Sequence, residues 1–80
     1  MDKIQLLIIR LQSIAKKNRD DFSYKIDINI SRSGITYRFV ATETADNHEF
    51  LDGFGVTIDD AVDNAERSIE ACCKQWGYKA

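Results

Sequence analysis

The sequence predicts an α+β domain of two layers, in which two helices cover one face of a three-stranded antiparallel sheet in the order α-β-β-β-α. Apolar residues recur at helical spacing over residues 3–17 and again over 58–76. Between these segments, apolar and polar residues alternate as they do in half-buried strands. We expect both helices to pack on the same face of the sheet, because that arrangement leaves no apolar stripe exposed.

Length and composition indicate one small domain spanning residues 1–80. Hydrophobic residues make up 44% of the chain and charged residues 30%, which is ordinary for a globular protein. No run approaches the roughly 20 apolar residues of a membrane span, and the N-terminus lacks the features of a signal peptide. The two cysteines, Cys72 and Cys73, are adjacent and poorly placed to pair with each other. We therefore expect a cytoplasmic, reduced protein with no membrane contact.

The first helix is expected to begin after Asp2, a suitable N-cap, and to end near Lys17. Its buried stripe consists of apolar residues spaced by three or four: Ile4, Leu7, Ile8, Leu11, Ile14 and Ala15. Leu6 and Ile9 fall on the opposite side of the helix, among polar neighbours. Two exposed apolar side chains at this spacing predict a contact site, for a homodimer or for another protein.

The first two strands are predicted from an unbroken alternation. The residues expected on the inward face are Phe22, Tyr24, Ile26, Ile28 and Ile30, followed by Ile35, Tyr37, Phe39 and Ala41. Residues 31–34 read as a four-residue hairpin connection, in which Gly34 can adopt a positive φ. Val40 is expected to point outward.

A short third strand is expected at about residues 48–52, with Phe50 facing inward, or Leu51 in its place if the register slips by one residue. Gly53 to Gly55 then reads as a loop. Thr57 is a good N-cap for one continuous helix that ends at Trp76, because Gly77 follows it at the position usual for a left-handed residue.

Small residues near this junction carry a resemblance to a known family. They match the spacing of the glycines, helix cap and packing alanines of the double-stranded RNA-binding domain: Gly53, Gly55, Thr57, Ala61 and Ala65. The α-β-β-β-α order is also that of the family, so the resemblance implies its scaffold. Residues 55–71 separately resemble the strand-to-helix junction of HicB-type antitoxins.

The residues with which that family grips RNA are replaced in this chain. Ile58 and Asp59 stand where the family has a pair of lysines, and Val62 stands at its later basic position. A carboxylate at a helix N-terminus repels phosphate. The resemblance therefore implies the scaffold without the RNA grip, and we expect no nucleic-acid partner at these positions.

The sequence offers no recognisable catalytic or metal-binding set. His48 is the single histidine, and no spacing places Cys72 or Cys73 beside it. Two cysteines and one histidine, without C-x-x-C spacing, do not supply the four ligands of a zinc site. We expect no catalytic residue, no metal and no cofactor.

The charge is divided unequally along the chain. Residues 1–38 hold eight Lys/Arg against four Asp/Glu, whereas residues 39–80 hold three against nine. On the last helix, four acids fall within a band about 60° wide, in spite of the repulsion between neighbouring like charges. This acidic ridge comprises Asp59, Asp63, Glu66 and Glu70. We expect Glu49 and Asp52, on the third strand, to continue it.

These features predict a non-enzymatic binding protein whose partner is a protein with a basic surface. The specific hypothesis is a phage- or mobile-element-type inhibitor of a nucleic-acid-processing or defence protein, for example a CRISPR protein, acting by charge mimicry. The alternative is a divergent double-stranded RNA-binding module that uses the basic residues of the first helix: Arg10, Lys16, Lys17 and Arg19.

Overall fold

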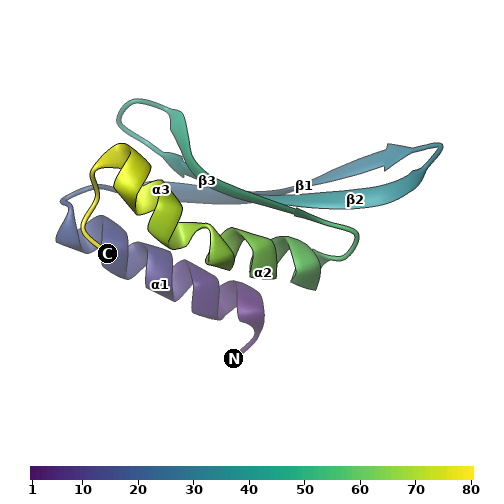
Figure 1. Cartoon of the computed structure of the whole chain (residues 1–80), viewed down its shortest axis with the longest axis horizontal. Coiled ribbons are helices and arrows are strands. Elements are labelled where there is room, and N and C mark those ends of the chain that lie inside the picture. The colour runs from purple at the N-terminus through teal and green to yellow at the C-terminus, as the bar shows by residue number, and fades with distance from the viewer.

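The computed structural model describes residues 1–80 and confirms the α+β fold class. Its elements are α1 (Lys3–Lys17), β1 (Phe22–Ser31), β2 (Gly34–Glu43), β3 (His48–Gly55), α2 (Ile58–Arg67) and α3 (Ile69–Trp76). The strands form one antiparallel sheet in the order β1-β2-β3, and the helices lie on one face of it (Figure 1). The arrangement is compatible with the scaffold of the double-stranded RNA-binding domain, apart from the division of the last helix in two.

Helix α1 begins and packs as its sequence predicts. Asp2 accepts a hydrogen bond from the backbone N–H of Gln5, and the Gln5 side chain accepts one from the Asp2 N–H, which forms a capping box. The residues buried on its inner side are Leu7, Leu11, Ile14 and Ala15. Lys16 and Lys17 occupy the last turn, where the helix dipole favours positive charge.

Strands β1 and β2 form a longer and tighter hairpin than expected. Their register is unbroken over ten pairs, from Phe22 opposite Glu43 to Ser31 opposite Gly34. Only Arg32 and Ser33 lie between the strands, so the predicted four-residue connection is a two-residue turn. Gly34 follows with a φ of 128°, a backbone conformation that residues with a Cβ rarely adopt.

Strand β3 contains a β-bulge that resolves the choice between Phe50 and Leu51. Ala41 lies opposite Leu51 and Thr42 lies opposite Glu49, so Phe50 is an extra residue without a partner on β2. Both Phe50 and Leu51 are buried. A regular alternation would allow only one of the two to face inward, and the bulge removes that constraint.

The prediction of a loop at Gly53 to Gly55 is wrong, because these residues complete β3. A Cβ added at Gly53 would lie 2.3 Å from the backbone nitrogen of Ala65 and 2.4 Å from the carbonyl oxygen of Ala61. One added at Gly55 would lie 2.4 Å from the Ala61 nitrogen. The glycines are therefore needed for the direct contact of α2 with the sheet and not for a turn.

The expected single C-terminal helix is divided at Ser68. The ψ angle of this residue is −5°, and its backbone N–H bonds to the carbonyl of Ala65, three residues back, in place of the fourth. Its hydroxyl also donates to that carbonyl, at 2.8 Å. The N-cap at Thr57 and the left-handed Gly77 are both found as predicted.

The core lies between the sheet and the three helices. Its cluster of 13 buried residues consists of Leu7, Leu11, Ile14, Ala15, Phe22, Phe39, Ala41, Phe50, Leu51, Val62, Ala65, Ile69 and Cys73. The ring centroid of Phe50 is 4.8 Å from that of Phe22 and 4.8 Å from that of Tyr78. Tyr78, which follows α3, therefore closes this end of the core.

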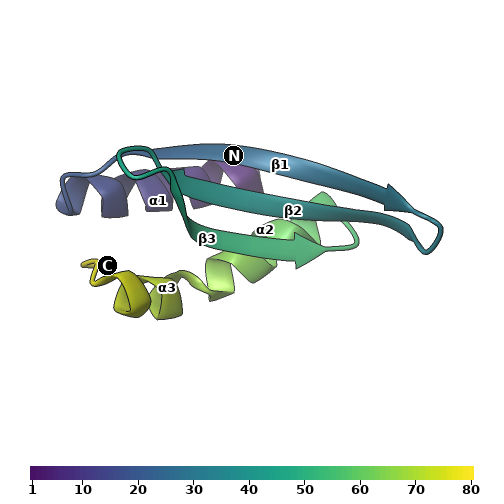
Figure 2. The same ribbon diagram turned by 90° about the horizontal axis from the view of Figure 1, so that it is seen from above.

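The expectation that the helices leave no apolar stripe exposed is wrong. Ile28, Ile30 and Ile35 lie on the helix-facing side of the hairpin, yet they are 60%, 74% and 48% exposed. The pairing of β3 with β2 stops at Tyr37, whereas β1 and β2 continue to the turn. The end of the hairpin thus extends past the helices (Figures 1 and 2). Val40 pairs with Lys25 and Asp52, in keeping with its expected place on the outer face, but it is fully buried there.

Candidate functional site

The most exposed apolar surface of the sheet lies at the free end of the β1–β2 hairpin. We name this the hairpin overhang and define it by Ile28, Ile30 and Ile35. Ile30 and Ile35 are direct cross-strand partners. At this end the sheet has only two strands, and no helix lies beneath them (Figure 1). Three large aliphatic side chains on one uncovered face form a patch of the kind that marks protein contacts.

The start of α2 adds further apolar surface and an acidic rim near the overhang. The connection from β3 to α2 leaves the sheet at the base of the overhang, where Gly55 pairs with Tyr37 (Figure 1). Val56 is largely exposed there, and Ile58 is partly exposed. Asp59 and Asp60 follow in the first turn of α2, where the helix dipole favours negative charge.

Half of the predicted acidic ridge is engaged in ion pairs with α1. Asp63 lies 3.0 Å from the Nζ of Lys3, and Glu66 lies 3.7 Å from Arg10. The hydrogen bond and charge of Asp63 raise the pKa of Lys3 above its usual value. Asp59 and Glu70 form no ion pair. The unequal charge of the two halves of the chain thus serves in part to pair α1 with α2.

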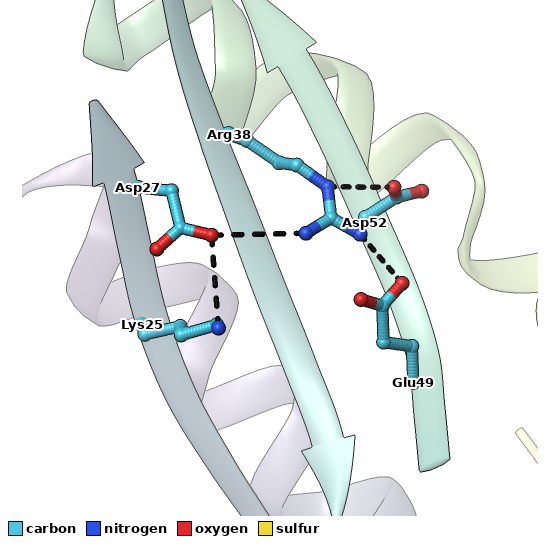
Figure 3. Close-up of polar contacts among 5 residues, drawn as sticks. All are labelled: Lys25, Asp27, Arg38, Glu49 and Asp52. Atoms are coloured by element: carbon cyan, nitrogen blue, oxygen red, sulfur yellow. Dashed lines mark hydrogen bonds and ion pairs between the residues drawn. The ribbon is translucent and has the colours of Figure 1, made fainter. Parts of the chain in front are cut away.

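The remaining predicted acids lie on the opposite side of the sheet. Asp52 and Glu49 accept hydrogen bonds from Arg38, at 3.1 and 2.5 Å, and Asp27 of β1 lies 3.7 Å from the same guanidinium (Figure 3). The Arg38 guanidinium also lies over the ring of Phe54. Glu49 and Asp52 therefore do not continue the ridge on α2, because β3 separates the two sets.

Leu6 and Ile9 are placed as the sequence predicts. They are 54% and 50% exposed, on the side of α1 that faces away from its buried stripe. This pair lies on α1, on a different face of the molecule from the hairpin overhang. Its use in a contact stays a prediction.

A polar cluster that sequence reasoning missed lies at the β2–β3 turn. Glu43 is 2% exposed, and its carboxylate accepts hydrogen bonds from the backbone N–H groups of Ala45 and Asp46, at 2.7 and 2.9 Å. The Nδ1 of His48 lies 3.3 Å from Glu43. Ligand atoms of Glu43, Asp46 and His48 lie within 4.8 Å of one another, which is close enough to hold a cation. Both oxygens of Glu43 already accept backbone hydrogen bonds, so the carboxylate mainly stabilises the turn.

The C-terminal residues close the same end of the molecule. The hydroxyl of Tyr78 donates to Asp20, and Asn18 exchanges hydrogen bonds with the backbone of Lys79. Burial tends to raise the pKa of Asp20, but the hydrogen bonds from Tyr78 and from the Asp21 N–H outweigh it and hold the pKa below its usual value. Burial and the bond to Asp20 raise the pKa of Tyr78. These contacts attach the C-terminus to the α1–β1 connection.

None of the helices is long and apolar enough to cross a membrane. Comparisons with protein-family models, with curated proteins and with solved structures found no match to this chain. The surfaces described above are therefore the basis for a functional proposal.

Proposed function

We propose that this chain is a non-enzymatic binding domain that attaches to another protein through the hairpin overhang. The observation that carries the proposal is the exposure of Ile28, Ile30 and Ile35 on the side of the sheet that elsewhere forms the core. A folded domain gains stability by covering such a surface, and here its own helices do not reach it. A partner that covers the overhang gains the free energy of removing this apolar area from water.

The charges near the overhang favour a partner with a basic rim. Asp59 is exposed and free of ion pairs, and Asp60 lies beside it in the same turn. An apolar anchor flanked by acids complements an apolar pocket flanked by Lys or Arg, and such complementarity raises the rate of association and its specificity. The partner we propose is thus a protein with a basic surface that surrounds an apolar site.

The specific form of the proposal is a phage- or mobile-element-type inhibitor of a nucleic-acid-processing or defence protein. Basic grooves that bind nucleic acid have the surface chemistry that an acidic rim fits. In this version the carboxylates that meet the groove are Asp59 and Asp60, in the first turn of α2 beside the overhang. Asp63 and Glu66 contribute less, because Lys3 and Arg10 partly neutralise them.

The second candidate is a double-stranded RNA-binding module, and the order of its elements favours it. Lys16, Lys17 and Arg19 gather at the end of α1, where they could meet phosphates. Against it, Arg10 pairs with Glu66, and the N-terminus of α2 carries Asp59 in place of a base.

Capture of partners by matched double variants tests the proposal. The protein and its variants are immobilised, exposed to an extract of the source cells, and the bound proteins are quantified by mass spectrometry. The overhang variant is Ile30→Ser with Ile35→Ser. One control is Leu6→Ser with Ile9→Ser, which removes an exposed apolar pair elsewhere, and the other is Glu66→Lys with Glu70→Lys.

The expected result is a protein retained by the wild type and by both controls. Once purified, this captured protein should bind the overhang variant at least about tenfold more weakly than it binds the wild type, because a central apolar contact is lost. Loss in the Glu66/Glu70 variant alone would indicate charge mimicry by the ridge. Binding of duplex RNA by purified wild type, with a footprint near 16 base pairs, would support the second candidate. Equal capture by all variants would exclude the overhang as the binding surface.

A further inference from the structure

The two edges of the sheet differ in their capacity to pair with another strand. Strand β3 is interrupted by the bulge at Phe50, which disturbs the row of backbone groups along that edge. Strand β1 is ten residues long, regular throughout its pairing with β2, and has no neighbour on its other side (Figure 2). An unbroken free edge of this length can accept an antiparallel strand.

The sequence of β1 is complementary to itself in the antiparallel direction. Lys25 and Asp27 flank Ile26, and all the outward-facing residues other than these two are uncharged: Ser23, Asn29 and Ser31. When two copies of β1 pair about a two-fold axis through Ile26, Lys25 of each copy lies opposite Asp27 of the other. The same pairing places Phe22 opposite Ile30, so residues 22–30 of both strands are used.

We infer that the protein forms a two-fold symmetric dimer in which the β1 strands of two copies pair antiparallel about Ile26. The product is a continuous six-stranded sheet with all helices on one face. An isologous contact of this kind closes on itself, so it yields a dimer and not a fibre.

Charge selects this register over its neighbours. Pairing centred on Lys25 would place the two Lys25 side chains opposite each other, and pairing centred on Asp27 would do the same for the two aspartates. Like charges directly opposite are unfavourable, whereas opposite charges are favourable. Lys25 and Asp27 are both at least half exposed in the monomer, lie 3.7 Å apart on the same face of β1, and Asp27 also lies 3.7 Å from Arg38 (Figure 3).

The apolar face of β1 supports the same arrangement. An apolar groove runs between α1 and the edge of the sheet, lined by Ile4, Ile8, Tyr24, Lys25, Ile26 and Phe39. In the dimer, Ile28 of one copy lies opposite Tyr24 of the other, beside this groove. The dimer thus borders the hairpin overhang along the free edge of β1 only. Ile35, on β2, lies away from that edge and remains available to the partner proposed above.

A charge-swap experiment in solution tests the dimer. Sedimentation equilibrium is measured for the wild type, for Lys25→Asp, for Asp27→Lys, and for the variant with both changes. Each single change places like charges opposite each other at two symmetric sites, and should weaken association at least about tenfold. The double change exchanges the signs and should restore the dimer.

Mixing the two single variants provides the sharpest measurement. The Lys25→Asp chain carries two acids at positions 25 and 27, and the Asp27→Lys chain carries two bases, so an equimolar mixture should form a heterodimer. Circular dichroism melting of each variant verifies that it is folded. An effect on folding alone would not be reversed by adding a second, differently charged chain.

Three outcomes would overturn the inference. The first is a wild type that stays monomeric up to about 1 mM, since a weaker contact has no role at ordinary protein concentrations. The second is a dimer that is unaffected by the single changes. The third is a dimer lost only in the Leu6→Ser, Ile9→Ser variant, which would place the contact on α1. Because Ile30 lies in β1, the dimer and the overhang are separated by the Lys25→Asp variant, which should lose the dimer but keeps Ile28, Ile30 and Ile35 and should still capture the partner.

Discussion

The two ends of the β1–β2 hairpin carry the same alternating pattern but have different surroundings. At one end, Phe22 and Ala41 lie in the core beneath the helices, whereas at the other end Ile30 and Ile35 face solvent. The difference follows from length. A helix of 15 residues is about 22 Å long, whereas a strand of ten residues is about 33 Å long. Helix α1 therefore cannot cover β1 from end to end, and the alternation decides which face is apolar but not how much of it is covered.

The largest effect is expected at the covered end, where α2 contacts β3. Gly53→Ala would bring a methyl group within 2.7 Å of three backbone atoms of Ala61 and Ala65. Backbone atoms cannot move aside as a flexible side chain can, so the free energy of unfolding should fall by at least about 3 kcal/mol. Urea denaturation measures this change. Phe54→Ala, one residue away on the exposed side, is the control and should cost less than about 1 kcal/mol.

An intermediate effect is expected at the contact that closes the covered end. Tyr78→Phe removes the hydrogen bond to Asp20 and keeps the packing on Phe22 and Phe50. The free energy of unfolding at pH 7 should fall by about 1–2 kcal/mol.

The pH dependence of that effect gives a second measurement. The pKa of Asp20 is lowered in the folded protein, so its contribution to stability is present above the usual carboxyl pKa and is lost as the pH falls through the lowered value. The difference between wild type and Tyr78→Phe should therefore shrink below about pH 4. A difference that stays constant from pH 7 to pH 3 would mean that the ionised carboxylate is not the acceptor.

The smallest effect is expected in the hairpin overhang. Ile28→Asp places a charge on a side chain that is 60% exposed, so the free energy of unfolding of the monomer should change by about 0.5 kcal/mol or less. Thermal melting at low protein concentration measures it. A loss of cooperative folding in this variant would show that Ile28 belongs to the core and that the two ends of the hairpin do not differ.

Local signals predicted much of the fold. The caps at Asp2 and Thr57 and the left-handed Gly77 depend on nearest neighbours in the chain, and the sequence therefore predicts them directly. The buried stripe of α1 follows from its periodicity in the same way. The bulge at Phe50 depends on packing between distant segments, which has no local signature.

The role of two glycines is not predictable from the local sequence. Glycine commonly supplies a turn, and on that ground Gly53 and Gly55 are expected in a loop. Their actual role is to let α2 approach the sheet, which becomes visible only when Ala61 and Ala65 are in place. The pairing of Lys3 with Asp63, across 60 residues, has no local sequence signature for the same reason.

Only part of the candidate site is predictable from the sequence. The exposure of Leu6 and Ile9 follows from the helical wheel, which separates the two faces of α1. The hairpin overhang depends on the difference in length between α1 and β1, which the alternating pattern does not reveal. The symmetry of Lys25 and Asp27 about Ile26 is legible in the sequence, but it gains meaning only once β1 is known to be an edge strand.

Because of the break at Ser68, α3 is a short separate helix with few buried residues. It can therefore open without unfolding of the rest of the domain. Only Ile69 and Cys73 are buried along it. Burial also raises the pKa of the Cys73 thiol, which keeps it unreactive in the folded protein, whereas its neighbour Cys72 is partly accessible. Because solvent reaches one of these adjacent thiols more readily than the other, their rates of modification can report local unfolding of α3. We expect a thiol reagent to react with Cys72 in the native state and with Cys73 only in molecules whose α3 has opened, so the ratio of the two rates should measure how often that opening occurs.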